Sequence, residues 1–442
     1  MGRRIAVVTL GCEKNQVDSE VMMGLMERWG FHLVADPQEA DVIVVNTCGF
    51  VDQAKAESVN TILQMAQYKE TGHCKALVVA GCLAQRYQEE LMREIPEIDG
   101  MLGTGEFHRV PEVVEQALAG RHPMRFGNPV YLYDEVTPRK RIGLPYSTYV
   151  KIAEGCDHGC TFCAIPLMRG KFRSRPIPSI VEEARRLAAD GVREISLIAQ
   201  DSTQYGLDLY GRRRLPDLLT ALNDVDGLRW IRLHYAYPGY FTDELIDAMA
   251  GLPKVCKYVD LPLQHSEDEV LRAMHRPGRK SQVRKLLERI RTRIPNVAIR
   301  SSFIVGFPGE TEEQFLRLAD FVEEMAFDRI GVFAFSREEG TPSASMEGQI
   351  SEAEKERRAA WLMEVGRKAS AARGAARVGQ VIDCLLERQD DRRPDIWIGR
   401  SEYDAPEIDG QVFVSGVNGR PGEFVKVRIT HSFDFDLAGE GV

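Results

Sequence analysis

The chain has 442 residues, of which 44% are hydrophobic and 28% are charged, and it carries a net charge of −9. This length predicts roughly two to four domains, and the composition excludes a disordered or low-complexity protein. The negative net charge excludes a global attraction to nucleic acid, although a local basic patch remains compatible with it.

The sequence predicts a cytoplasmic protein that does not enter a membrane. No stretch approaches the roughly 18 apolar residues of a membrane span. The apolar run at residues 5–10 is far shorter than a signal-peptide core and is followed at once by Gly11 and Cys12. In the reducing cytoplasm, disulfides are a poor explanation for the nine cysteines. Metal binding or catalysis is the better interpretation.

Short β-branched runs alternate with helical or polar stretches at the beginning of the chain. The runs are "RIAVVTL" at 4–10, "ADVIVVNT" at 40–47 and "CKALVVAG" at 74–81. This alternation predicts an α/β domain with a parallel, buried sheet over residues 1–120. The next residues, 121–140, are rich in Pro, Gly and charge and are predicted to form a linker.

Six further strand-like runs lie within residues 141–375, with helical stretches between them. The runs are "TYVKIAE", "EISLIAQ", "RWIRLHY", "KYVDLPL", "VAIRSSFIVGF" and "RIGVFAFS". Six βα units predict a partial (β/α)6 version of the eight-unit barrel, with its active site at the C-terminal ends of the strands. The charged helix at 351–377 is interpreted as a linker. Residues 376–442 contain about five short strands, which predict a small antiparallel β-barrel of the oligonucleotide-binding type.

The segment "EGCDHGCTFCAIP" places Cys156, Cys160 and Cys163 on one tight loop directly after a strand. All three thiolates can reach one metal centre. His158 lies between the first two, so a Cys3His zinc loop is one interpretation, and the spacing alone suits zinc and iron–sulfur sites alike. A 4Fe-4S cluster with only three cysteine ligands keeps one iron without a protein ligand, where a cofactor can bind.

A second set of cysteines follows the three N-terminal strands. Cys12, Cys48 and Cys82 each come directly after a predicted parallel strand and beside a glycine. Loops after parallel strands gather at one edge of a sheet, so these three thiols are expected to meet. Three ligands again favour an open 4Fe-4S cluster over a closed zinc site, and the alternative is buried structural thiols. The remaining cysteines are interpreted as structural: Cys74, Cys256 and Cys384.

The central loop resembles the signature of the radical S-adenosylmethionine (SAM) enzymes, with its C-x3-C-x2-C spacing and Phe162 before the last cysteine. The resemblance implies a radical SAM domain at 141–375. In it, Cys156, Cys160 and Cys163 would hold a 4Fe-4S cluster whose open iron chelates the amino and carboxylate groups of SAM. Reductive cleavage of SAM would then give a 5′-deoxyadenosyl radical that removes hydrogen from an unactivated carbon.

The resemblance also suggests SAM contacts at the ends of later strands. Gln200 lies where this family contacts the amino group of the methionine moiety. Gln264 and His265 end the fourth strand. Gly306 and Gly309 end the fifth, where a glycine lets the backbone approach a ligand. The glycines can equally make only a turn, and His265 can equally be a core or loop histidine.

The order of the three domains resembles the radical SAM methylthiotransferases over essentially the whole chain, with a C-terminal barrel of the TRAM, OB-like type. The resemblance implies a second 4Fe-4S cluster on Cys12, Cys48 and Cys82, which takes part in sulfur delivery. SAM serves twice, as methyl donor and as radical source. One branch of the family modifies an adenosine beside the tRNA anticodon. The other modifies the β-carbon of an aspartate in small-subunit ribosomal protein number twelve.

Several stretches resemble the ribosomal-protein branch: "GCDHGCTFCAIPLMRGKFRSRP", "QDSTQYG" and "SEYDAPEIDGQVFV". Charge gives an independent argument, because residues 378–442 contain seven Lys and Arg against thirteen Asp and Glu, a balance of −6. Such a barrel would repel RNA phosphates, which argues against direct tRNA binding, and would suit a basic ribosomal protein.

A basic run follows the cluster loop: Arg169, Lys171, Arg173 and Arg175. It either attracts a carboxylate of the substrate or cofactor, or is a solvated loop. No catalytic residue is identified beyond the cluster ligands.

The expected enzyme therefore uses two 4Fe-4S clusters and SAM, and acts on ribosomal protein number twelve, free or on the 30S subunit. An electron donor such as flavodoxin or ferredoxin would supply the reducing electrons. Two alternatives remain. One is a tRNA adenosine methylthiotransferase with the same mechanism, and the other is a non-enzymatic zinc or iron–sulfur protein that binds ribosomes.

Overall fold

A six-stranded, all-parallel sheet forms the N-terminal part of the computed structural model, which describes residues 2–442. In spatial order its strands are β2 (His32–Leu33), β1 (Arg4–Thr9), β3 (Val42–Thr47), β4 (Ala76–Gly81), β5 (Gly100–Leu102) and β6 (Met124–Arg125). Its helices are α1 (Glu13–Arg28), α2 (Asp52–Ala66), α3 (Tyr68–Thr71), α4 (Cys82–Glu94) and α5 (Val110–Leu118).

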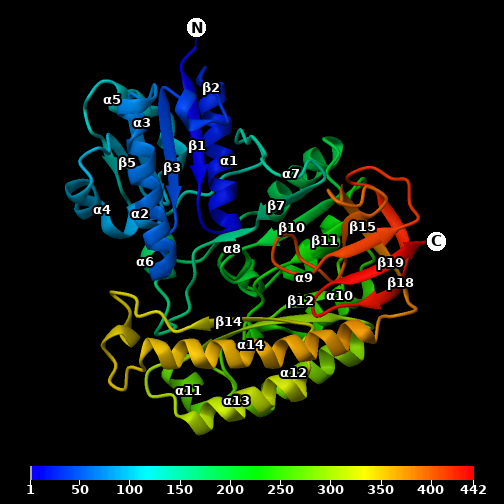
Figure 1. Cartoon of the computed structure of the whole chain (residues 1–442). Coiled ribbons are helices and arrows are strands. Elements are labelled where there is room, and N and C mark those ends of the chain that lie inside the picture. The colour runs from blue at the N-terminus through cyan, green and yellow to red at the C-terminus, as the bar shows by residue number, and fades with distance from the viewer. Residues whose placement is uncertain (1) are drawn as a thin grey trace.

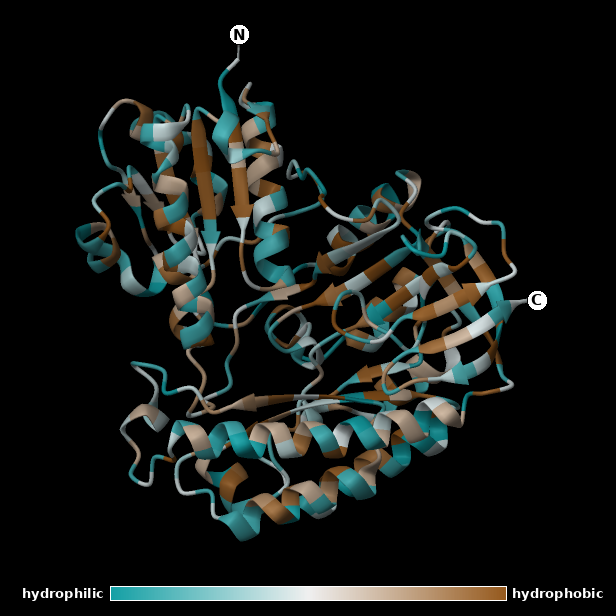
Figure 2. Ribbon diagram, viewed as in Figure 1, coloured by the Kyte–Doolittle hydropathy of each residue, from teal (hydrophilic) through white to brown (hydrophobic). Residues whose placement is uncertain are grey.

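Both faces of this sheet are covered, which explains its continuous apolar strands. Val42 and Val44 of β3 pack into one core with residues of α1 and α5, whereas Ile43 and Val45 pack into a second core with residues of α2 and α4. Successive side chains of a strand point to opposite faces, so a strand buried on both faces must be apolar throughout. Figure 2 shows β1 and β3 hydrophobic along most of their length.

Two three-stranded parallel sheets form the central domain, and an isolated parallel bridge pairs Ile231 of the first sheet with Val255, three residues before the second. Their strands are β7 (Ser147–Lys151), β10 (Glu194–Ile198) and β11 (Trp230–Leu233), then β12 (Tyr258–Asp260), β13 (Ala298–Val305) and β14 (Arg329–Ala334). The prediction of a partial (β/α)6 barrel is confirmed. A short hairpin, β8 (Ala153–Glu154) with β9 (Arg173–Ser174), flanks the cluster loop.

Helices follow the strands of the central domain. They are α6 (Ile165–Arg169), α7 (Ile177–Ala189), α8 (Leu207–Tyr210), α9 (Leu215–Asn223), α10 (Asp243–Gly251), α11 (Asp268–Ala273), α12 (Lys280–Arg293), α13 (Glu312–Met325) and α14 (Glu352–Ala375). The interpretation of the last of these as a linker is wrong, because α14 packs along β14 and α13 (Figure 1). Leu362 and Gly366 of α14 are buried there. No helix within residues 2–442 is long and apolar enough to cross a membrane.

The C-terminal part is a closed five-stranded barrel in the order β15-β16-β17-β19-β18. The strands are β15 (Val381–Gln389), β16 (Trp397–Ser401), β17 (Val412–Ser415), β18 (Phe424–Ser432) and β19 (Leu437–Gly441). A small β-barrel is confirmed, but β17 and β19 pair in parallel. Five strands cannot alternate in direction all the way around a closed barrel, so one pair must be parallel.

Buried ion pairs fix this barrel to the central domain. Glu194 at the start of β10 pairs with Arg400 of β16 at 2.6 Å and with Arg232 of β11 at 3.1 Å. Arg329 of β14 reaches Asp404 at 2.7 Å, beyond β16. Figure 1 shows the N-terminal domain and the C-terminal barrel on different sides of the central domain.

Candidate functional site

The three N-terminal cysteines lie at the carboxyl edge of the parallel sheet. Cys12 caps α1 after β1, Cys48 directly follows β3, and Cys82 opens α4 after β4. The loops approach so closely that a Cβ added to Gly11 would lie 3.0 Å from the Cys48 sulfur. Gly11 has a φ of +87°, which favours glycine. A Cβ added to Gly49 would lie 3.0 Å from the Cys82 backbone, so the structure brings the three cysteine-bearing loops together.

Burial and mutual repulsion act on these thiols. Burial, with the neighbouring Cys82 thiolate, raises the pKa of Cys48 to about 12. Burial also raises the pKa of the Cys82 thiol, which the charge of Arg169 opposes. A metal centre supplies the positive charge that holds such thiols in the deprotonated form, so this donor set fits a metal cluster.

The central cysteines lie on the loop between β8 and α6. The loop is held at one end by the bond from the Cys156 amide to the Gly170 carbonyl at 3.0 Å, and inside by the bond from the Cys163 amide to the Cys160 carbonyl at 3.1 Å. Burial raises the pKa of Cys156 and of Cys163 to about 12. The charge of Cys160 adds to both shifts, so the three thiols are close enough to interact.

His158 is engaged elsewhere. Its Nε2 lies 2.7 Å from the Asp201 carboxylate, and its ring stacks on Tyr237 with 3.9 Å between the centroids. Among residues 2–442, no three His, Cys, Asp or Glu side chains are arranged to hold a single metal ion. In a 4Fe-4S cluster each cysteine binds a different iron, so its ligands need not converge on one point. The arrangement thus favours a cluster over a Cys3His zinc loop.

The five suggested SAM contacts have different surroundings. Gln200 donates to the Glu154 carboxylate at 2.7 Å, and its own Oε1 is buried without a partner among the described residues. Gln264 has a φ of +73° and forms backbone bonds with Ser302 and Ile304. A Cβ added to Gly309 would meet no described atom within 4 Å.

The surroundings of His265 and Gly306 favour the plainer interpretations. The Nε2 of His265 lies 3.3 Å from the Glu310 carboxylate, and its Nδ1 accepts from the Glu267 amide at 3.0 Å, as in a core histidine. The amide of Gly306 donates to Glu310, and a Cβ there would lie 2.4 Å from Cγ of Lys355. This glycine serves the packing of the turn.

Several further polar groups lie in or after the strands of the central domain, and of these only Ser266 could be singled out from the sequence. They are buried without a hydrogen-bond partner among the described residues: Ser196 Oγ, Gln204 Oε1, His234 Nε2, Tyr237 OH and Ser266 Oγ. Burial lowers the pKa of His234 to about 4, so its imidazole is neutral near pH 7. Unpartnered buried polar groups are costly unless a ligand or water satisfies them. They fit a polar cofactor such as SAM. For His234, its position directly after β11 was the available signal.

Arg276 was also missed. Its Nη1 lies 3.9 Å from the Cys160 sulfur, and its Nη2 donates to the Pro262 carbonyl at 2.6 Å. It precedes α12 by a few residues, far from the cysteine loop in sequence, so no local pattern indicates its position.

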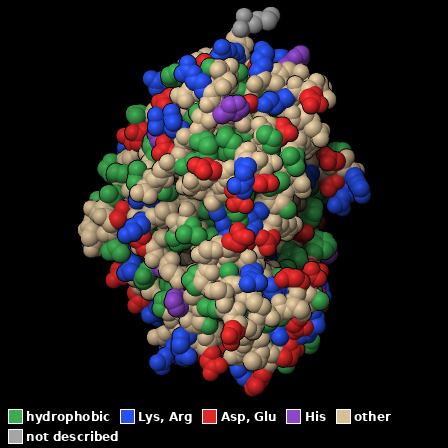
Figure 3. Space-filling view, turned by 90° about the vertical axis from the view of Figure 1, so that its left-hand side faces the viewer, with side chains coloured by type: hydrophobic (Ala, Val, Ile, Leu, Met, Phe, Trp, Pro, Cys, Tyr) green, Lys and Arg blue, Asp and Glu red, His purple; other side chains and the backbone are tan. Residues whose placement is uncertain are grey.

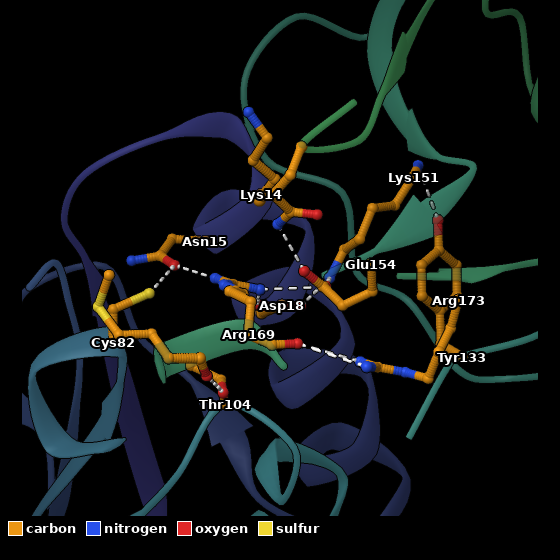
Figure 4. Close-up of polar contacts among 12 residues, drawn as sticks. Lys14, Asn15, Asp18, Cys82, Thr104, Tyr133, Lys151, Glu154, Arg169 and Arg173 are labelled. Atoms are coloured by element: carbon orange, nitrogen blue, oxygen red, sulfur yellow. Dashed lines mark hydrogen bonds and ion pairs between the residues drawn. The ribbon is translucent and has the colours of Figure 1, made fainter. Parts of the chain in front are cut away.

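A buried charge network links the N-terminal domain to the helix that follows the central cysteine loop (Figure 4). Arg169 of α6 reaches Asp18 of α1 at 2.8 Å and Glu154 of β8 at 3.1 Å. Lys151 of β7 pairs with the same two carboxylates. The interpretation of the basic run as a solvated loop is therefore wrong for Arg169, which is 2% exposed, and for Arg175, which is 1% exposed.

Three family models match the chain. Residues 4–103 match the uncharacterized protein family UPF0004, residues 150–322 the radical SAM superfamily and residues 378–442 the TRAM domain. The fold resembles a solved radical SAM methyltransferase, TsrM from Kitasatospora setae, with a TM-score of 0.56 and 17% identity over 78% of this chain and 74% of that one. A solved cobalamin-dependent SAM radical enzyme, OxsB, gives a TM-score of 0.52 at 10% identity over 82% of this chain and 56% of that one. The radical SAM family model, with this fold around it, defines the class of protein as a radical SAM enzyme.

Curated relatives refine that class. A protein of Desulforamulus reducens named ribosomal protein uS12 methylthiotransferase RimO is 54% identical over 439 residues, which is 99% of each chain. A protein of the same name from Heliobacterium modesticaldum is 49% identical over 99% of this chain and 95% of its own. One from Geobacter sulfurreducens is 48% identical over 99% of this chain and 98% of its own. The chain belongs to the RimO family of radical SAM methylthiotransferases.

Proposed function

We propose that this chain transfers a methylthio group to the β-carbon of an aspartate in ribosomal protein uS12. The observation that carries the proposal is the presence of two three-cysteine sets in a chain 54% identical over its length to an enzyme of that name. The tRNA alternative is not favoured, because the curated relatives bear the uS12 name.

In this proposal both cysteine sets hold 4Fe-4S clusters. Cys156, Cys160 and Cys163 hold the cluster that binds SAM, and Cys12, Cys48 and Cys82 hold the second. Bound there, the cofactors supply the radical that removes hydrogen from the substrate carbon, the sulfur and the methyl group.

The residues of the chain bind, orient and shield these groups. The unpartnered His234 Nε2, Tyr237 OH and Ser266 Oγ offer hydrogen bonds to the polar groups of SAM. Glu154 holds the Gln200 amide at 2.7 Å and so fixes the direction of its free Oε1. The low exposure of this region keeps water from a reactive radical.

The substrate protein would be met in the cytoplasm, free or on the 30S subunit, with flavodoxin or ferredoxin as electron donor. The charge argument for this partner needs correction. Asp404 and Asp409 of the C-terminal barrel pair with Arg329 and Arg300 of the central domain, so their charges are neutralised within the chain. On the face drawn in Figure 3, acidic and basic side chains are interspersed and form no extended basic field for RNA.

The test is anaerobic reconstitution followed by mass spectrometry of a uS12 peptide. About eight iron per chain and a methylthio mass increase on the aspartate are expected. Cys156→Ala should abolish 5′-deoxyadenosine formation, whereas Cys82→Ala should spare much of it and stop sulfur transfer. Modified tRNA nucleosides with an unmodified peptide would favour the tRNA alternative. Zinc with little iron would contradict the enzyme altogether.

A further inference from the structure

Arg169 occupies the junction between the two cysteine sets. It is the last residue of α6, directly beyond the central cysteine loop, yet its side chain points into the N-terminal domain. There its Nη2 donates to the Asn15 side-chain oxygen and its Nη1 to Asp18 at 2.8 Å. Both partners belong to α1, which begins beside Cys12. One guanidinium therefore connects the two domains.

Asn15 links Arg169 to the loops that carry the N-terminal cysteines. Its side-chain amide donates to the carbonyls of Leu10 and Thr47, at 2.9 Å each. These residues lie just before Cys12 and Cys48. Its side-chain oxygen lies 3.8 Å from the Cys82 sulfur and also accepts from Arg169. The Asn15–Arg169 pair thus contacts all three cysteine-bearing loops, and the buried charge of Arg169 lies one side chain away from the Cys82 sulfur.

The same guanidinium leads to the expected SAM site. Its Nη1 donates to Glu154 at 3.1 Å, and the other oxygen of Glu154 accepts from Gln200 at 2.7 Å. The amine of Lys151 pairs, at 2.6 Å, with the Glu154 oxygen that accepts from Arg169. Two buried cations, Lys151 and Arg169, thus balance two buried carboxylates, Asp18 and Glu154. The route from Cys82 to Gln200 passes through three side chains, those of Asn15, Arg169 and Glu154.

We propose that Arg169 is a positioning residue that aligns the N-terminal cluster with the SAM site and raises the reduction potential of that cluster. This inference rests on the proposed function, in which Cys12, Cys48 and Cys82 hold a 4Fe-4S cluster. Reduction adds negative charge to a cluster that already carries thiolates. A buried cation beside a ligand stabilises the reduced form, since charge and hydrogen bonds at the sulfurs set such potentials, and burial limits screening by salt.

The first experiment isolates the N-terminal cluster. A reference variant with Ala in place of Cys156, Cys160 and Cys163 should retain about four iron per chain. Arg169→Gln is added to this reference, and the matched control is Lys171→Gln, which removes an exposed cation from the same loop. A redox titration followed by electron paramagnetic resonance measures each midpoint potential.

Arg169→Gln should raise the ratio of oxidised to reduced cluster at a fixed potential at least tenfold, which is a negative shift of about 59 mV or more for one electron. Lys171→Gln should change the ratio less than twofold. An unchanged potential in Arg169→Gln with full iron would overturn the proposal. If Arg169→Gln loses its iron, Arg169→Lys is measured in its place. Restored iron, with a ratio of oxidised to reduced cluster within threefold of the reference, would support the role of the cation. Iron that stays lost would contradict it.

A second readout tests the alignment in the otherwise unaltered enzyme. Arg169→Gln should raise the amount of 5′-deoxyadenosine formed per methylthiolated peptide at least tenfold, because SAM cleavage continues while sulfur delivery is misaligned. An unchanged ratio would contradict the positioning role. Failure of the proposed function would give a different result. A reference variant without iron would contradict the assignment of a cluster to the N-terminal cysteines. A reference variant that holds its iron, but whose potential does not change with Arg169→Gln, would contradict only the role of Arg169.

Discussion

Glu310 determines the conformation of the glycine turn after β13. Its carboxylate accepts from the amides of Gly306 and Phe307, and its other oxygen lies 3.3 Å from the His265 ring. Arg358 approaches the same carboxylate at 3.3 Å. Because the turn amides are satisfied within the chain, this turn serves as a rigid support beside the site, and its amides are not free for a ligand.

Gly155 is the residue on which the central cysteine loop depends most directly. It has a φ of +78°, and an added Cβ would lie 2.1 Å from the Lys171 carbonyl oxygen. We expect Gly155→Ala to open this loop at a strain of about 1–3 kcal/mol and to lose most of the iron at Cys156, Cys160 and Cys163. Iron analysis and SAM cleavage measure the effect.

Gly159 is the matched control for that change. It lies in the same loop, and an added Cβ would meet no described atom within 4 Å. Gly159→Ala should therefore keep its iron and its rate of SAM cleavage. Equal iron content in the two variants would show that the close approach of Gly155 to the Lys171 carbonyl is not needed to hold the loop.

At the scale of elements, α14 shows why a sequence pattern can mislead. Its buried face includes Lys355, Arg358, Gly366 and Ser370, which read as a solvated helix. The amine of Lys355 pairs with Glu352 one turn away, and Arg358 bonds to Glu354 of the same helix and, outside it, to the Glu310 carbonyl. Long side chains bury their stems and keep their charges paired. Only the three-dimensional partners reveal this helix as part of the barrel wall.

Gly366 allows α14 to approach β14. An added Cβ would lie 2.2 Å from Cδ1 of Ile330. We expect Gly366→Ala to lower the free energy of unfolding by about 1–3 kcal/mol through overpacking, although Ala is the better helix former. Gly251→Ala, at the end of α10 with no described atom within 4 Å, should be neutral or stabilising. Urea denaturation of both variants measures the difference, and equal midpoints would contradict the packing argument.

At the scale of the molecule, local patterns predicted what local physics determines. The strand endings before Cys12, Cys48 and Cys82 were sufficient to place those loops at one edge, because parallel strands share a direction. The network around Arg169 was not predictable, since Asn15 lies 154 positions away and belongs to another domain. The pairing of acidic residues of the C-terminal barrel with arginines of the central domain was not predictable either. Both need the relative placement of domains, which no periodicity encodes.

Glu194 tests how firmly the C-terminal barrel is held. It is fully buried between Arg232 and Arg400, and although burial alone would raise its pKa, these arginines lower the pKa to about 2. Glu194→Gln leaves two buried arginines short of a partner and should reduce the free energy of unfolding by about 3–5 kcal/mol. Fluorescence during urea denaturation can follow the change, because Trp230 and Trp397 lie in the core shared by the two domains.

The pH dependence gives this prediction its sign. The folded pKa of Glu194 lies below the ordinary value of 4.5, so its stabilisation is fully present above about pH 4.5 and declines as the pH falls towards 2. The difference in unfolding free energy between the original protein and Glu194→Gln should therefore stay constant from pH 7 to 5 and shrink below pH 4.5. Glu440→Gln, which changes an exposed acid of the C-terminal barrel, should alter stability by less than about 0.5 kcal/mol. A difference that does not shrink in acid would mean that the charge of Glu194 is not what holds the two domains together.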